Sequence, residues 1–302
     1  MISISSLLLP SMMSMKENTI QQKSNFKKSI VVISWDGNSS PLSYLLKDTV
    51  PDFDIFIFDY SGQDNASQLE GLQPAYYLSQ KTECKGDILQ GVYHYLIQHS
   101  VTDFKYIGLL DDDIFISFSD LNKLVFIANL EQLDVFQASL THDSYYHHRQ
   151  FIQKTGRVMM PTNWVEIMSP FYSSEVFFEA GKDFNRSISG TGIDVYLIPT
   201  IQVLIGKTKT AVVHAVSMKH CRPIRTDNRI FRNGKDNLTE IAELQSYCMD
   251  IVKRNPTKFE PDFVRDIINR KHVYGIPLAY KLKRLPTLFT NLYRFLVDES
   301  YR

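Results

Sequence analysis

Residues 106–116 read YIGLLDDDIFI, and this stretch decides the fold class. Five largely apolar residues end in three consecutive carboxylates, which is typical of a buried parallel strand with a polar site at its carboxyl end. Three adjacent carboxylates repel one another unless solvent or a cation compensates them. The alternative is a solvated acidic turn, but the apolar residues on both sides argue against it. An extended backbone would let Asp111 and Asp113 share one divalent cation while Asp112 faces away.

Apolar runs of the same kind recur before and after this stretch. Residues 29–35 and 53–58 each end in a turn signal, and 134–139 is a further strand candidate. The spacing of apolar residues predicts helices over 86–99 and 119–133. This alternation predicts an α/β fold with a mostly parallel sheet flanked by helices, in which ligands bind at the carboxyl ends of the strands.

The second half of the chain is less regular. We predict strands over 164–170 and 211–216, a helix that begins after Ser173 or Ser174, and a helix over 238–254. The expected organisation is a weakly ordered leader over 1–28, a catalytic domain over 29–226 and a C-terminal helical extension over 227–302.

The composition of the 302 residues excludes several classes of protein. Hydrophobic residues make up 44%, so the chain can bury a core without disulfides or metals. Lys plus Arg equal Asp plus Glu at 33 each, which argues against a nucleic-acid binder. The three cysteines are far apart and no apolar stretch is long enough to cross a bilayer, which fits a cytoplasmic protein. Residues 2–13 lack the preceding basic segment of a signal peptide.

Two further patterns could carry chemistry. The turn 190–192, Gly-Thr-Gly, allows close backbone approach to a ligand, and Asp194 after it is either a general base or a helix cap. His214 and His220 are either metal ligands or ordinary histidines of the core or surface. The histidines within 142–148 suit a phosphate or a sugar, or belong to an exposed loop. The chain contains no phosphate-binding loop, dinucleotide fingerprint or nucleophile elbow.

Four blocks in order carry a resemblance to a known family: 106–113, 164–173, 189–194 and 212–220. Together they resemble the domain-of-unknown-function family 707, which groups with nucleotide-sugar-dependent glycosyltransferases of the GT-A fold. The resemblance covers about residues 29–226. It departs from the family at Thr191, where the family has Trp, and at His214, where the family often has Asp. His220 is therefore the better-matched histidine.

That resemblance implies a metal-dependent glycosyltransferase with a GT-A-like, Rossmann-like sheet. Asp111 and Asp113 would hold Mn²⁺ or Mg²⁺ against the diphosphate of a nucleotide sugar, and His220 would complete the metal site. The nucleotide-sugar donor would be contacted by Trp35, Asp36, Lys85, Asp111 and Asp112.

The resemblance also implies a catalytic base in inverting members. Asp194 is the first choice, because it follows a turn that does not obstruct a sugar. Glu166 is the second choice, since Trp164 beside it offers an aromatic face to an acceptor ring.

Two other classes of function remain open. A nucleotidyltransferase or phosphohydrolase would use the same triplet with two metals, although residues 35–40 lack the Lys or Arg of a nucleotidyltransferase signature. A non-catalytic carbohydrate-binding protein could share the fold, but it would have no need of the acidic and histidine residues.

The C-terminal extension combines basic and apolar residues. Between 267 and 297 there are six Lys or Arg and no acid, among many Leu and Phe. Such a segment either lies on an anionic membrane or packs as helices on the catalytic domain. Peripheral membrane contact would suit a glycan or glycolipid acceptor.

Overall fold

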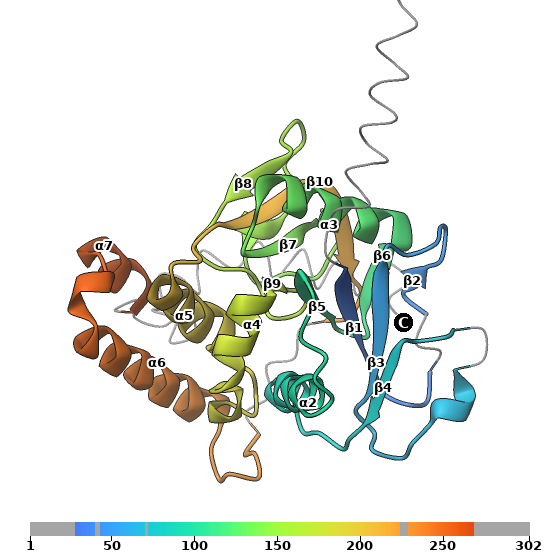
Figure 1. Ribbon diagram of the computed structural model, residues 1–302, viewed down its shortest axis with the longest axis horizontal. Coiled ribbons are helices and arrows are strands. Elements are labelled where there is room, and N and C mark those ends of the chain that lie inside the picture. Colours follow the sequence, from blue (N-terminus) through green and yellow to red (C-terminus); the bar gives the residue numbers. More distant parts are fainter. Residues whose placement is uncertain (1–27, 40–42, 70–71, 224–228, 269–302) are drawn as a thin grey trace, which may run out of the picture.

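The computed structural model describes residues 28–39, 43–69, 72–223 and 229–268, and it confirms the α/β class with a curled, mostly parallel sheet. The strands are hydrogen-bonded in the order β2-β6-β10-β7-β9-β5-β1-β3-β4, with β8 paired to β10 (Figure 1). Their bounds are β1 Ser29–Trp35, β2 Leu45–Leu46, β3 Phe53–Asp59, β4 Tyr76–Ser79, β5 Tyr106–Leu110, β6 Ile114–Ser117, β7 Val135–Leu140, β8 Met159–Pro161, β9 Phe171–Ser173 and β10 Thr210–His220.

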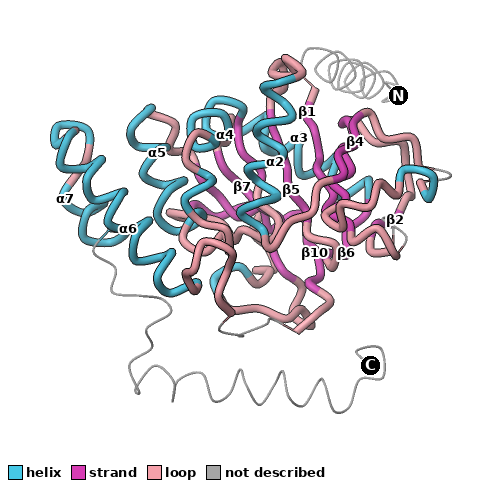
Figure 2. The backbone as a smooth tube through the Cα atoms, turned by 90° about the horizontal axis from the view of Figure 1, so that it is seen from below, coloured by secondary structure: helices cyan, strands magenta, loops and turns pink. Residues whose placement is uncertain are grey.

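Helices cover the sheet on both sides. Helix α3 packs on β10 and β7, while α2, α4, α5 and α6 follow one another along the other side (Figure 1). Figure 2 shows α6 and α7 at the end of the molecule opposite to β2 and β4. The bounds are α2 Lys85–Gln98, α3 Phe118–Glu131, α4 Ser174–Gly181, α5 Ile198–Ile205, α6 Asn237–Arg254 and α7 Pro261–Phe263, with π-helical turns at Ile193–Leu197 and Val264–Ile268 and 3₁₀ turns at Ala66–Gln68, Arg149–Phe151, Phe184–Arg186 and Pro256–Lys258.

Most long elements lie where their sequence patterns predict them. The strands predicted over 29–35 and 53–58 are β1 and β3, and the helix predicted over 86–99 is α2. Ser173 caps α4, since its hydroxyl accepts a hydrogen bond from the Val176 amide. For α3 the cap is Ser117 rather than Ser119, because the Ser117 hydroxyl accepts from the Asp120 amide at 3.0 Å.

The strand predicted over 164–170 is wrong. This segment is a loop whose side chains Trp164 and Val165 are buried, so a run of buried residues imitates a strand in the sequence. Its last residues continue the register of the β5–β9 pair, since the Pro170 and Met168 carbonyls accept from the Leu109 and Asp111 amides at 2.9 and 3.0 Å. Its earlier part does not, since the Glu166 amide donates to the Gln137 side chain at 2.6 Å.

The sheet topology places the acidic triplet. Strands β1, β3 and β5 are parallel, and Ile33 of β1 pairs with Leu110 of β5, so these strands end at one edge. The chain turns at the triplet and returns as β6, where Ile114 pairs with His220 at the end of β10. This pairing brings a histidine from the late part of the chain beside the acidic turn.

A close contact between strands depends on one glycine. An added Cβ at Gly108 of β5 would lie 2.3 Å from the ring of Phe171 in β9, so only glycine allows this ring to cross β5.

No helix among the described residues is long and apolar enough to span a membrane. The described residues end at Ile268, so nearly all of the basic and apolar segment over 267–297 lies outside them.

Candidate active site

A cavity of about 560 Å³ lies at the sheet edge where β5 ends. It joins the turn after β5, the start of α2, the loop after β8 and the end of β10. Its lining residues are Ser34, Tyr60, Thr82, Glu83, Cys84, Lys85, Ile88, Asp111, Asp112, Asp113, His147, His148, Glu166, Ile167, Met168, Asp194, His220, Arg222 and Pro223. The cavity thus brings together residues from all four sequence blocks described above.

The acidic triplet forms a turn, and all three carboxylates line the cavity. The prediction that Asp112 faces away is wrong, because a turn does not alternate its side chains as a strand does. Lys85 forms an ion pair with Asp111, whose pKa is raised by burial despite the lysine. Asp112 accepts a hydrogen bond from the Tyr60 hydroxyl at 2.7 Å and pairs with Arg222 at 2.5 Å.

Asp113 and His220 face each other across the turn. The His220 Nε2 lies 3.3 Å from Asp113 Oδ2, and its Nδ1 lies 2.9 Å from the Tyr145 carbonyl, to which it can donate. Burial alone would raise the pKa of Asp113, but His220 and Arg222 hold it below its usual value. The other oxygen, Asp113 Oδ1, is buried and has no hydrogen-bond partner among the described residues.

These two residues suit a divalent cation. A histidine that ligates metal commonly donates its second ring nitrogen to a carbonyl, and Asp113 offers an unpartnered oxygen. Within the described ranges, however, no three His, Cys, Asp or Glu side chains are grouped as a metal site. A third ligand would come from Asp111 or Asp112, whose carboxylates are paired with Lys85 and Arg222.

Asp194 and Glu166 form a second acidic group in the cavity. Both are buried, and Asp194 Oδ2 accepts a hydrogen bond from the Ile167 amide at 3.2 Å. Burial raises the pKa of Asp194 to about 7 although backbone amides oppose the rise. Burial raises the pKa of Glu166 well above its usual value, and the neighbouring Asp194 adds to this. Gly192 rather than Asp194 precedes the helical turn Ile193–Leu197, so the structure does not support the helix-cap alternative.

The aromatic surface expected beside Glu166 is covered. Trp164 is only 3% exposed and packs edge-on against His148 and Phe151, with ring centroids 4.8 Å apart in both pairs. Its ring is therefore not available to an acceptor sugar. His147 and His148 line the cavity instead.

Some of the residues expected to contact the nucleotide line the cavity and others do not. Lys85 lines the cavity, as does Ser34 at the end of β1. Trp35 is buried and donates to the Ser39 carbonyl, and Asp36 accepts from the Ser39 amide at 3.0 Å. Neither of these two is among the lining residues. His214 also lies outside the lining, and its Nδ1 accepts from the Lys154 amide at 3.3 Å.

Sequence reasoning missed three residues that organise this site. Tyr60 and Arg222 bind the acidic triplet, and Arg222 could have been noticed from its place two residues after His220. Glu240 of α6 is fully buried and supports the turn before Asp194. It accepts hydrogen bonds from the Ile188 and Ser189 amides at 3.0 and 2.9 Å. No local pattern in the sequence marks Glu240.

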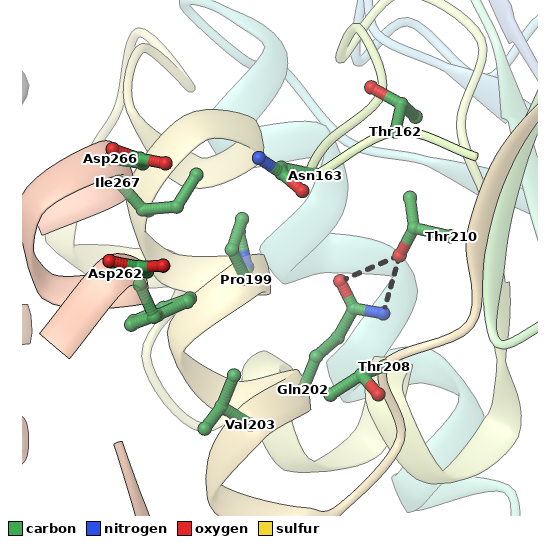
Figure 3. Close-up of a pocket in the computed structure, with 11 residues that line it drawn as sticks. Thr162, Asn163, Pro199, Gln202, Val203, Thr208, Thr210, Asp262, Asp266 and Ile267 are labelled. Atoms are coloured by element: carbon green, nitrogen blue, oxygen red, sulfur yellow. Dashed lines mark hydrogen bonds between the residues drawn. The ribbon is translucent and has the colours of Figure 1, made fainter. Parts of the chain in front are cut away.

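A second cavity of about 250 Å³ lies between α5, the start of β10 and the segment from α7 onward. Figure 3 shows Gln202 and Thr210 hydrogen-bonded to each other on one side, with Asp262 and Asp266 on the other. It shares no lining residue with the larger cavity and contains none of the predicted site residues.

Comparison with known proteins identifies the fold and no closer relationship. No family model matches the sequence, and no curated protein sequence does either. Among solved structures, the chain is similar to S. aureus TarS 1-349, with TM-score 0.52, 11% identity and coverage of 88% of this chain and 79% of that one. A complex of the same protein with UDP-GlcNAc gives TM-score 0.54 at 12% identity, covering 92% and 82%. At 11–12% identity these similarities show the fold alone, a mixed α/β fold with a curled, mostly parallel sheet flanked by helices.

Proposed function

We propose that this protein is a metal-dependent, inverting glycosyltransferase that moves a sugar from a nucleotide-sugar donor to a hydroxyl of a glycan or glycolipid. The observation that carries the proposal is one cavity that holds both Asp113 with His220 and the buried pair Asp194 with Glu166. The fold similarity to a protein solved with UDP-GlcNAc supports a nucleotide sugar as the donor.

The donor's diphosphate would lie near the acidic turn. Asp113 and His220, with Asp111 or Asp112, would hold Mn²⁺ or Mg²⁺, which supplies positive charge to the leaving nucleoside diphosphate. Lys85 lines the same wall and adds a fixed positive charge next to Asp111.

Asp194 is the better candidate for the base. As the acceptor hydroxyl attacks the anomeric carbon, its proton passes to the Asp194 carboxylate and the bond from the sugar to the diphosphate oxygen breaks. With its pKa at about 7, Asp194 is ionised in a useful fraction at neutral pH. Burial and the neighbouring Asp194 raise the pKa of Glu166 well above its usual value, which favours Glu166 as a hydrogen-bond donor to the acceptor.

A thermal-shift screen of nucleoside diphosphates and nucleotide sugars, with and without Mn²⁺, tests the proposal. Binding at a hundredfold excess over Kd should stabilise the protein by about 2.7 kcal/mol. Asp113→Asn should remove the part of this stabilisation that depends on Mn²⁺, while the protein still folds. Asp143→Asn is the matched control, since this exposed aspartate pairs with Lys219 and lies outside the cavity.

The hydrolysis products of each ligand separate the alternatives. Release of a nucleoside diphosphate from a nucleotide sugar supports the glycosyltransferase. Release of pyrophosphate or phosphate from nucleotides would identify a nucleotidyltransferase or a phosphohydrolase. Sugar binding without any turnover would identify a carbohydrate-binding protein and refute the proposal.

A further inference from the structure

Arg222 pairs with two of the carboxylates that would hold a divalent cation. Its guanidinium lies 2.5 Å from Asp112 Oδ1, and its Nε lies 3.3 Å from Asp113 Oδ2. Both carboxylates line the cavity, and Arg222 lines it with them. A carboxylate has room for a hydrogen bond and a metal ion together, but the guanidinium and a divalent cation repel each other, so Arg222 in this place weakens cation binding.

The contact with Asp113 is loose. A charge-assisted hydrogen bond between nitrogen and oxygen is about 2.7–2.9 Å long. Asp113 Oδ2 instead lies 3.3 Å from both Arg222 and His220, and the buried Arg222 Nε has no hydrogen-bond partner among the described residues. Asp113 is therefore only loosely paired, and its buried Oδ1 is open to a cation.

Arg222 can leave without disturbing the fold. Its side chain is 42% exposed. The backbone before it is fixed, since the Cys221 amide donates to the Asp113 carbonyl at 2.9 Å and His220 pairs with Ile114. A change of side-chain rotamer is thus sufficient to release both carboxylates.

In a loaded cavity the donor's diphosphate is a further anion for a freed guanidinium, and Lys85, the lysine of the lining, is already paired with Asp111. The planar, doubly donating group of an arginine matches the oxygens of a phosphate. We propose that Arg222 and the divalent cation exchange: Arg222 neutralises Asp112 and Asp113 in the empty cavity, and moves to the donor's diphosphate when the cation binds. This inference rests on the proposed function.

Calorimetric titration of Mn²⁺ without nucleotide tests the exchange directly. Arg222→Gln should bind Mn²⁺ about tenfold more tightly than the unchanged protein, because the competing cation is gone. At saturating Mn²⁺, the same variant should bind a nucleoside diphosphate about tenfold more weakly. Arg222→Lys keeps the charge but not the paired donors of the guanidinium. Its affinities for Mn²⁺ and for the nucleoside diphosphate should lie between those of Arg222→Gln and the unchanged protein.

Lys219→Gln is the control for loss of one positive charge. Lys219 lies on β10, next to His220 but on the opposite face of the strand, and it pairs with Asp143 at 2.8 Å. It should change neither affinity appreciably. Equal Mn²⁺ affinity in Arg222→Gln and the unchanged protein would overturn the exchange, and so would stronger nucleoside diphosphate binding in the variant.

Two further outcomes separate this inference from the proposed function. If the protein binds and turns over nucleotide sugars equally well in EDTA, the exchange is refuted while the transferase activity stands. If it binds neither Mn²⁺ nor any nucleotide, the proposed function fails and the exchange fails with it.

Discussion

At Asp194, burial and backbone donors act on one carboxylate in opposite directions. Burial is the larger effect, so the pKa rises to about 7 even though the Ile167 amide donates to the side chain. The ionised form is costly in this place, and that cost is what makes the group basic enough to accept a proton. The same feature links catalysis to the stability of the fold.

The pH dependence of stability should show this link. An unfolded aspartate has a pKa of about 3.9. Between about pH 4 and 7 the folded protein therefore holds a proton that the unfolded chain has lost, and the stability from Asp194 falls as pH rises through this range. Asp194→Asn cannot ionise, so its melting temperature relative to the unchanged protein should rise between pH 5 and pH 8. A difference that stays constant with pH would contradict the burial argument.

Turnover should respond to the same substitution in a different way. Asp194→Asn should keep donor binding but lose about 100-fold or more in turnover, the usual range for a general base. Glu166→Gln is the comparison, since it keeps a hydrogen-bond donor and should lose less. If Glu166→Gln loses as much and Asp194→Asn transfers normally, the base is Glu166.

At the scale of elements, α6 supports the turn that carries the base. Glu240 on α6 accepts hydrogen bonds from the amides of Ile188 and Ser189 and from the Asn233 side chain. Burial would raise the pKa of Glu240, but these donors hold it below its usual value. On the next turn of α6, Leu244 lies beside Gly192. The φ of Gly192 is +89°, and a Cβ added to this glycine would lie 3.3 Å from Leu244 Cδ2.

Glu240→Gln should therefore weaken both stability and transfer. An amide group has one acceptor oxygen where the carboxylate has two, so at least one buried donor loses its partner, at a cost of about 1–3 kcal/mol. Denaturant unfolding measures this loss. Glu243→Gln on the same helix is the control, because it removes only an exposed ion pair with Lys235 and should change stability by less than about 1 kcal/mol. An equal effect in the two variants would argue against the anchoring role.

At the scale of the whole molecule, the prediction of peripheral membrane contact concerns residues beyond Ile268. The basic and apolar sequence there should bind anionic vesicles at low salt and release them at high salt. Co-sedimentation with phosphatidylserine vesicles measures this. Replacement of Lys281, Lys283 and Arg284 by Glu should abolish it, while neutral vesicles should bind neither protein. Failure of the unchanged protein to sediment with anionic vesicles refutes the prediction.

Local sequence was sufficient to predict the features that depend on neighbouring residues. Continuous apolar runs predict β1, β3 and β5, because a strand buried on both faces needs apolar side chains throughout. The acidic triplet directly after β5 then fixes the functional edge. Local information misled where burial imitated a strand, as at Trp164, and where strands of three or four residues such as β6 and β9 leave too short a pattern. It also misled at Asp112, where an extended backbone was expected and a turn is present.

Which charged side chains pair with one another depends on the folded chain and is not visible in the sequence. Arg222 reaches Asp112 across more than a hundred residues of chain, and Glu240 reaches Ser189 from 51 residues further along the chain. The raised pKa of Asp194 depends on how many atoms exclude water around it, a quantity that the identity of its sequence neighbours does not contain. Pairing and desolvation are properties of distances in space, and folding alone sets those distances.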